Sequence, residues 1–362
     1  MSLFFYPATL ALPALLALST LVFFRWEQQI RARSRVASLL IGNALLSVLC
    51  LSLGFALGET YYRFIYDTTD SFASTLVALR WMDRHYESNN WGVRDDIDYQ
   101  PKMAEGARRV TFLGDSFTEG YGVADVEQRF VNLIRKRDRS REVHGLSSAG
   151  ASTETEINVL RDSLRRGYEL DTVVLVYCLN DASERTREWN ERYSKLYADF
   201  WSENFFVRNS YFVNTLFFRY KRKRNPDAKN YFHFIRHGYT GRNWDAQELL
   251  FHRLRALVKR NGGQLRVVTF PFLHNMGPEY PYADIHEKLA AFWERLGVPD
   301  LDLLGVYRDY SSDELVVNPY DAHPNVFAHR LAADAIGRFL DGEPGSADAR
   351  NAATDAFGRE RR

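Results

Sequence analysis

The chain has 362 residues, of which 46% are hydrophobic and 26% charged, a composition typical of a globular protein with a sizeable core. Its formal net charge of +1 gives the chain as a whole no basic footprint, so nothing indicates nucleic acid as a partner. Two cysteines, Cys50 and Cys178, are too few for a disulfide framework or a thiolate metal site.

Two uncharged runs, residues 4–24 and 36–57, open the chain, and each is long enough to cross the ~30 Å hydrocarbon layer of a bilayer. Met1-Ser2-Leu3 carries no side-chain cation, which favours a retained transmembrane hairpin over residues 1–57 rather than a cleaved signal peptide. We interpret the hairpin as a simple anchor. The alternative is attachment to a larger membrane partner, in which Asn43 would hydrogen-bond between helices.

The link between the two runs, residues 25–35, contains four arginines and one glutamate. The positive-inside rule keeps such a link on the cytoplasmic side. Everything after Leu57 is therefore expected outside the cytoplasm, in the periplasm if the host is Gram-negative. Residues 58–100 are expected to form an aromatic juxtamembrane stem followed by a turn-rich lead-in that packs over the edge of a sheet.

A short apolar strand, residues 110–113, runs into the turn Gly114-Asp115-Ser116, and the chain favours a helix again only after Val123. A serine hydroxyl held at a strand end between glycines suits acyl transfer, because a backbone N–H can face the developing oxyanion and the substrate can approach closely. The alternative is an ordinary turn, which Gly-Asp-Ser also forms.

The rest of the chain alternates strands with helices, which predicts an α/β fold with a parallel sheet covered on both faces. Thr153 and Glu156 predict a capping box at the start of one helix. The expected strands are residues 142–146, 172–178, 265–270 and 301–304, and the expected helices are residues 130–137, 153–166, 245–260, 282–296 and 326–340.

Two segments depart from this alternation. Residues 182–245 are interpreted as an aromatic and basic insertion, which includes the run Phe218-Arg219-Tyr220-Lys221-Arg222-Lys223-Arg224. A solvated helix end is the favoured interpretation of that run, with an anionic membrane surface or an anionic glycan as alternatives. Residues 342–362, rich in alanine, glycine and charge, are expected to be disordered.

Ser116, Gly150 and Asn180 each follow a predicted strand end, where open α/β sheets collect their functional groups. A base is expected at His323, in a turn before the last helix, with Asp321 accepting one imidazole N–H so that the other ring nitrogen serves Ser116. The alternative is that His323 caps the helix and Asp321 forms the turn. His274 is a second candidate, and His329 is expected to pack or to face solvent.

Four blocks stand out in chain order. They are Gly114-Asp115-Ser116-Phe117-Thr118, Gly150 in a loop of small residues, Cys178-Leu179-Asn180-Asp181, and Asp321-Ala322-His323-Pro324-Asn325. With these blocks the sequence resembles the SGNH or GDSL hydrolases, in particular bacterial members with membrane anchors. The segment Asn89-Asn90-Trp91-Gly92-Val93-Arg94-Asp95 is also similar to the segment before the first block in such members, and the resemblance covers residues 89–340.

The resemblance implies a three-layer α/β/α, flavodoxin-like hydrolase domain over residues 101–341. It implies Ser116 as the nucleophile, His323 as the general base and Asp321 as its orienting group. It also implies an oxyanion hole made by the backbone N–H groups of Ser116 and Gly150 and the side-chain amide of Asn180. No metal or organic cofactor is implied. Two positions depart from the usual pattern, because Cys178 stands where glycine is common and His323 follows Asp321 by two residues instead of three.

We therefore expect a membrane-anchored serine esterase or acyltransferase acting on an ester, with O-acetyl groups of envelope polysaccharide or lipid esters as candidate substrates. The two departures motivate a rival interpretation, a catalytically silent scaffold that binds glycan or a membrane protein partner. A flavodoxin-like nucleotide-binding protein is a weaker rival, because no glycine-rich phosphate loop is present.

Overall fold

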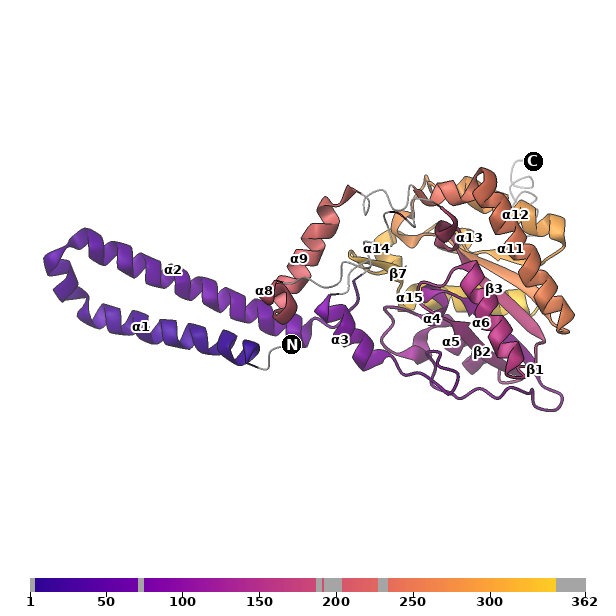
Figure 1. Cartoon of the computed structure of the whole chain (residues 1–362), viewed down its shortest axis with the longest axis horizontal. Helices are drawn as coiled ribbons and strands as arrows, with labels where there is room; N and C mark the ends of the chain where they lie inside the picture. Colours follow the sequence, from indigo (N-terminus) through magenta and orange to yellow (C-terminus); the bar gives the residue numbers. More distant parts are fainter. Residues whose placement is uncertain (1–3, 71–74, 187–190, 192–203, 227–233, 343–362) are drawn as a thin grey trace, which may run out of the picture. The chain divides into compact units, whose positions relative to one another are not determined.

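The computed structural model describes residues 4–70, 75–186, 191, 204–226 and 234–342 (Figure 1). It divides into two compact units, Met1–Trp81 with Leu196–Asn225, and Met82–Lys195 with Pro226–Arg362. The expected insertion, residues 182–245, is thus shared between the two units, and its residues 187–190, 192–203 and 227–233 lie outside the described part. The tail predicted to be disordered lies outside it too, apart from Gly342.

The first unit opens with two long apolar helices, α1 (Phe5–Arg33) and α2 (Arg35–Thr60). By length and composition both could cross a membrane, with mean hydropathies of 1.9 and 2.2 in their most apolar windows. The polar link at residues 25–35 is helical on both sides of Ser34, so the two helices extend beyond the apolar runs. The Ser34 hydroxyl accepts a hydrogen bond from the Ala37 N–H at 3.3 Å and so begins α2.

The chain beyond α2 in this unit is also largely helical. A single π-helical turn, η1 (Tyr61–Ile65), continues α2, and α3 (Leu76–His85) leads on towards the second unit. The helices α8 (Phe205–Asn209) and α9 (Tyr211–Arg224) complete the first unit.

The second unit is built on a five-stranded, all-parallel sheet of order β2-β1-β3-β4-β5. The central strand β3 is buried on both faces, as its run of β-branched residues predicts. The predicted parallel sheet is confirmed, and every expected strand forms within a few residues of its predicted bounds. The strands are β1 (Arg108–Gly114), β2 (Arg141–Ser147), β3 (Thr172–Cys178), β4 (Gln264–Phe270) and β5 (Asp300–Asp302).

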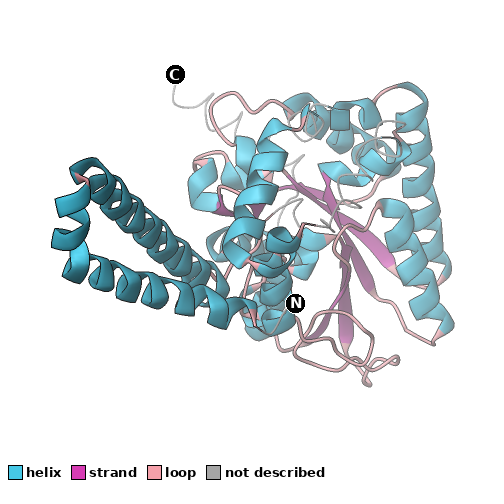
Figure 2. Ribbon diagram, turned by 60° about the vertical axis from the view of Figure 1, so that its left-hand side comes forward, coloured by secondary structure: helices cyan, strands magenta, loops and turns pink. Residues whose placement is uncertain are grey.

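Helices cover both faces of this sheet (Figure 2), which confirms the three-layer α/β/α arrangement. On one face lie α6 (Thr153–Arg165), α11 (Gly241–Arg260) and α12 (Ala283–Leu296), and the rings of Phe251 and Trp293 join the last two with centroids 4.6 Å apart. On the other face lie α5 (Phe130–Arg137) and α15 (Val326–Leu340), where the Phe130 N–H donates to His329 Nδ1 at 3.2 Å. His329 is therefore a packed residue.

Short elements fill the connections. They are α4 (Ser116–Glu119), η2 (Val126–Gln128), η3 (Leu179–Arg185), η5 (Arg236–Tyr239), η6 (Leu273–Asn275), α13 (Leu304–Tyr307), α14 (Ser312–Leu315) and the antiparallel pair β6 (Val316–Asn318) and β7 (Asp321–Pro324).

Two local predictions were wrong. The capping box of α6 does not form, because Ser152 is the N-cap, Thr153 accepts a hydrogen bond from Gln247 at 2.8 Å, and the Glu156 side chain is buried. The helix expected only after Val123 begins at the serine itself, since Asp115 caps the single turn α4 by accepting from the Phe117 N–H at 2.9 Å.

Candidate active site

Ser116 is held by a tight turn at the carboxyl end of β1. Gly114 ends the strand, and a Cβ at this position would lie 2.9 Å from the carbonyl oxygen of Val176 on β3, so only glycine allows this close approach. Asp115 then caps α4, whose first residue is Ser116. The hydroxyl is thus fixed by a strand on one side and a helical turn on the other, and the side chain is almost fully buried.

His323 and Asp321 come from β7, more than two hundred residues further along the chain. His323 Nε2 lies 2.8 Å from Ser116 Oγ, and His323 Nδ1 lies 2.5 Å from Asp321 Oδ1. Asp321 Oδ1 also accepts the backbone N–H of His323 at 3.0 Å. The turn expected around His323 was wrong, because β7 pairs with β6 and holds the imidazole on a strand. The three side chains form one hydrogen-bonded relay despite the short step between Asp321 and His323.

The relay is largely buried and lies close to several carboxyl groups. Burial alone would lower the pKa of His323, but Asp321, and at longer range Asp115 and Glu119, raise it above its ordinary value. Burial raises the pKa of Asp115 to about 6, while the Phe117 N–H, His323 and the Asn180 amide act in the opposite direction. Burial also raises the pKa of Glu119. The surroundings therefore favour a positive charge on the imidazole, which is what a general base needs after it accepts a proton.

Gly150 and Asn180 follow the carboxyl ends of the two strands beside β1. Gly150 is exposed in the loop after β2, with a φ of 75° that favours glycine. This loop joins the end of β1 through the Ser148 N–H, which donates to the Gly114 carbonyl at 3.2 Å. Asn180 lies in η3, directly after β3, and its side-chain amide lowers the pKa of the Asp115 carboxyl through a hydrogen bond. The structure thus gathers the predicted site residues at one edge of the sheet.

Cys178, the unusual residue of the third block, is the last residue of β3. Its side chain is fully buried and its backbone N–H donates to Asp181 Oδ2 at 3.1 Å. Burial raises the pKa of the thiol well above its ordinary value. The thiol is therefore a neutral group in the protein core.

Three groups near the relay were not predicted to act there. The rings of Tyr121 and Phe117 lie 4.8 and 5.5 Å from the His323 ring, centroid to centroid. Arg94 is fully buried and donates to the carbonyls of Gly120 at 2.7 Å and Val123 at 2.6 Å, just beyond α4. Arg94 lies in the lead-in segment at residues 89–95, but its role could not be predicted, because a main-chain carbonyl can accept a hydrogen bond whatever the residue type.

His274, the second candidate base, lies in η6, and burial lowers its pKa to about 4.

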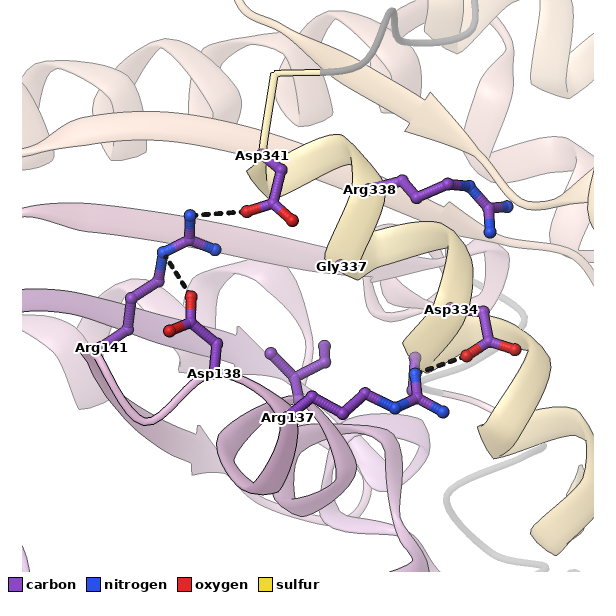
Figure 3. A pocket seen from close by; sticks show the side chains of 9 residues that line it. Arg137, Asp138, Arg141, Asp334, Gly337, Arg338 and Asp341 are labelled. Atoms are coloured by element: carbon purple, nitrogen blue, oxygen red, sulfur yellow. Dashed lines mark hydrogen bonds and ion pairs between the residues drawn. The ribbon is translucent and has the colours of Figure 1, made fainter.

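A separate hollow between the ends of α5 and α15 is lined by charged residues (Figure 3). It lies at the amino end of the sheet, because its Arg141 opens β2, whereas Ser116 follows the carboxyl end of β1. Its charges pair with one another, as in Arg141 with Asp341 at 2.7 Å and Arg137 with Asp334 at 2.5 Å. The hollow is thus a structural ion-pair region away from the relay.

No protein-family model matches the chain, and no curated protein is significantly similar to it in sequence. Among solved structures, it is similar to a member of the lipolytic G-D-S-L family from Veillonella parvula, with a TM-score of 0.41 and 12% identity over 66% of this chain and 100% of that one. It is similar to the lipase/acylhydrolase from Enterococcus faecalis, with a TM-score of 0.38 and 19% identity over 66% of this chain and 99% of that one. A third similar structure is the acetyl xylan esterase AlAXEase, with a TM-score of 0.40 and 14% identity over 63% of this chain and 97% of that one. These three similar structures are described as a lipolytic G-D-S-L family member, a lipase/acylhydrolase and an acetyl xylan esterase.

Proposed function

We propose that this chain is a membrane-anchored serine esterase or acyltransferase that works through an acyl-enzyme. The observation that carries the proposal is the relay of Ser116, His323 and Asp321, with 2.8 Å between Ser116 Oγ and His323 Nε2 and 2.5 Å between His323 Nδ1 and Asp321 Oδ1. An alcohol, an imidazole and a carboxylate in this order are the groups that nucleophilic acyl transfer requires.

In the proposed reaction, Ser116 Oγ attacks the carbonyl carbon of the ester while His323 Nε2 takes the hydroxyl proton. The tetrahedral intermediate then loses the alkoxide, which receives that proton from His323 and leaves as the alcohol. Water, or the hydroxyl of a second substrate, then attacks the acyl carbonyl carbon while His323 Nε2 takes its proton. The bond from that carbon to Ser116 Oγ breaks, Oγ receives the proton from His323, and the acid or the new ester leaves. The backbone N–H groups of Ser116 and Gly150 and the amide of Asn180 are the proposed donors to the oxyanion.

The location and the substrate belong to the proposal as well. The two apolar helices would anchor the chain in the cytoplasmic membrane, with the arginine-rich turn inside and the hydrolase unit outside or in the periplasm. Ser116 is only 7% exposed, which favours a small acyl group. We propose an acetyl ester on an envelope polysaccharide as the substrate, with lipid esters as the alternative.

The test is to incubate the full-length protein in detergent with a fluorophosphonate probe and with aryl esters of increasing acyl length. We expect covalent labelling of Ser116, turnover that is fastest for the acetate, and loss of both in Ser116→Ala. Ser152→Ala, which also replaces a buried serine at the start of a helix, is the matched control and should keep both activities. A folded wild-type protein that neither reacts with the probe nor turns over any ester would contradict the proposal and favour the silent scaffold.

A further inference from the structure

The helices α8 and α9 are locked onto the end of the apolar hairpin by one buried carboxylate. Glu59, in the last turn of α2, is fully buried and accepts hydrogen bonds from the Ser210 hydroxyl at 2.6 Å and from the N–H groups of Tyr211 and Phe212 at 3.1 Å each. These N–H groups open α9, so the carboxylate caps its positive end. Arg63 pairs with the same carboxylate at 2.6 Å and donates to the Asn209 carbonyl at 2.8 Å, which closes the junction.

Aromatic contacts join α8 to the start of α1. The ring of Phe5, at the start of α1, lies 5.9 Å from the ring of Phe205 and 6.3 Å from that of Phe206. Phe205 and Phe206 nevertheless remain 56% and 55% exposed. Exposed aromatic side chains of α8 therefore lie beside the start of α1.

The helix α9 presents one exposed face with two chemical characters. Leu216, Phe217 and Tyr220 are exposed, and they recur at the spacing that places residues on one side of a helix. Lys223 and Arg224, one turn further on, are also exposed, and the Arg224 guanidinium lies 4.8 Å from the centre of the Tyr220 ring. The opposite side of α9 is occupied, since Asn214 bonds the Leu76 N–H at 2.8 Å and Arg219 bonds the Tyr66 hydroxyl at 2.7 Å.

We propose that α8 and the exposed face of α9, named here the interface segment (Phe205, Phe206, Leu216, Phe217, Tyr220, Lys223 and Arg224), lie in the headgroup region of the bilayer that holds the hairpin. The inference rests on the membrane anchoring in the proposed function. Aromatic side chains concentrate at membrane interfaces, and lysine and arginine at their polar edge bind anionic lipid phosphates. The bilayer is the occupant that fits, because the Glu59 junction holds the start of α9 at the end of α2, and the Phe5 contacts hold α8 beside the start of α1.

The experiment measures membrane depth in the full-length protein reconstituted in vesicles of phosphatidylcholine and phosphatidylglycerol. Cys50 is replaced by serine, and the buried, neutral thiol of Cys178 stays unlabelled. Single cysteines at Phe206 and Phe217 carry an environment-sensitive fluorophore, and lipids with a spin label near the glycerol quench it. A fluorophore at Leu46 in α2 reports insertion of the hairpin, and one at Lys259 in α11 supplies the reference for the hydrolase unit.

We expect strong quenching at Phe206 and Phe217 by the lipids labelled near the glycerol, with an emission that is blue-shifted relative to that at Lys259. The fluorophore at Leu46 should instead be quenched most strongly by a second lipid, which carries its spin label near the end of the acyl chain. In the wild-type background, we expect the quenching at Phe217 to be stronger in vesicles that contain phosphatidylglycerol than in vesicles of phosphatidylcholine alone. Replacing both Lys223 and Arg224 by glutamine should remove this difference in quenching. Leu46 in lipid with Phe206 and Phe217 in water would overturn this inference alone and indicate a protein partner or a second copy on that face. Leu46 in water would overturn the membrane anchoring, while labelling of Ser116 by fluorophosphonate tests the chemistry independently.

Discussion

Asp321→Asn removes the negative charge behind His323 and keeps the shape of the side chain. Asp321 Oδ1 accepts two hydrogen bonds, from His323 Nδ1 at 2.5 Å and from the His323 backbone N–H at 3.0 Å. In the asparagine variant, we expect the side-chain oxygen to occupy the position of Oδ1. The amide nitrogen is disfavoured there, because it cannot accept a hydrogen bond from the His323 backbone N–H. The substitution therefore tests the charge more than the position of the imidazole.

The expected loss follows from the bond to the imidazole. Because asparagine keeps the hydrogen bond and loses only the charge, the cost is the difference between a bond to a charged group, about 1.5–3 kcal/mol, and a bond to a neutral group, about 0.5–1.5 kcal/mol. A difference of about 1–1.5 kcal/mol corresponds to about a 5- to 13-fold fall in kcat/KM. If the amide instead turned its NH₂ group towards Nδ1, the imidazole would hold the wrong tautomer and the loss would approach about 10⁴-fold. The retained backbone hydrogen bond favours the smaller value.

The substitution also predicts a change in pH dependence with a definite sign. Asp321 raises the pKa of His323, so its loss lowers that pKa, and the acidic limb of the kcat/KM profile should move to lower pH. The assay is hydrolysis of an aryl acetate by the full-length protein over a range of pH. Asp341→Asn, which breaks only the exposed pair with Arg141 at 2.7 Å, is the matched control. An unchanged kcat/KM and an unmoved acidic limb in Asp321→Asn would refute the assignment of Asp321.

Three further substitutions test other parts of the chain. Asn180→Ala should lower kcat by about 100- to 1000-fold with little change in KM, because one donor to the oxyanion is lost, as steady-state kinetics would measure. Glu156→Gln should raise the melting temperature more at alkaline than at acidic pH. Burial and Asp115 raise the pKa of Glu156, so above the ordinary pKa of glutamate the folded state binds more protons than the unfolded state. The wild-type protein therefore loses stability as the pH rises, and the variant avoids this loss. Glu59→Gln should reduce the hydrogen-exchange protection of one of the Tyr211 and Phe212 amides by about 10- to 160-fold. These two N–H groups donate to different oxygens of Glu59, and glutamine keeps only one acceptor oxygen, so one of them loses its acceptor.

Each has an outcome that would contradict it. Asn180→Ala with full activity would remove Asn180 from the oxyanion hole. A Glu156→Gln protein with the same pH dependence of melting as the wild type would mean that Glu156 is ionised in the folded state. Unchanged protection of both amides in Glu59→Gln would mean that the carboxylate does not hold α9, whereas Glu27→Gln, in α1, serves as the control that should leave these amides unchanged.

The layered sheet could be predicted from the sequence because its signals are local. The run of β-branched residues in β3 and the glycine stops after the helices each act within a few residues of where they stand. The short pair β6 and β7 could not be predicted in this way, because its pairing depends on a contact between Asn318 and Asp321 across a turn that reads only as polar sequence.

The candidate site shows the same division. Ser116, His323 and Asp321 were proposed from motifs, and the structure brings their side chains together. Arg94 lies in the lead-in segment at residues 89–95, but its role could not be predicted. Its hydrogen bonds go to backbone carbonyls, which every residue has, so the sequence contains no matching partner residue. Glu59 and the Ser210 hydroxyl lie 151 positions apart in sequence, and neither residue type predicts the other.

The division of the chain has a mechanical consequence for the enzyme that we propose. The polypeptide passes between the two units three times, after Trp81, after Lys195 and after Asn225. A catalytic unit on a single stem would be shed by one proteolytic cut, whereas a unit with three covalent attachments stays joined to the membrane helices after any single cut. A soluble version made by deleting only the apolar hairpin would still carry residues 196–225, stripped of the Phe5 ring that packs on them, so secretion of the hydrolase unit requires excising both pieces.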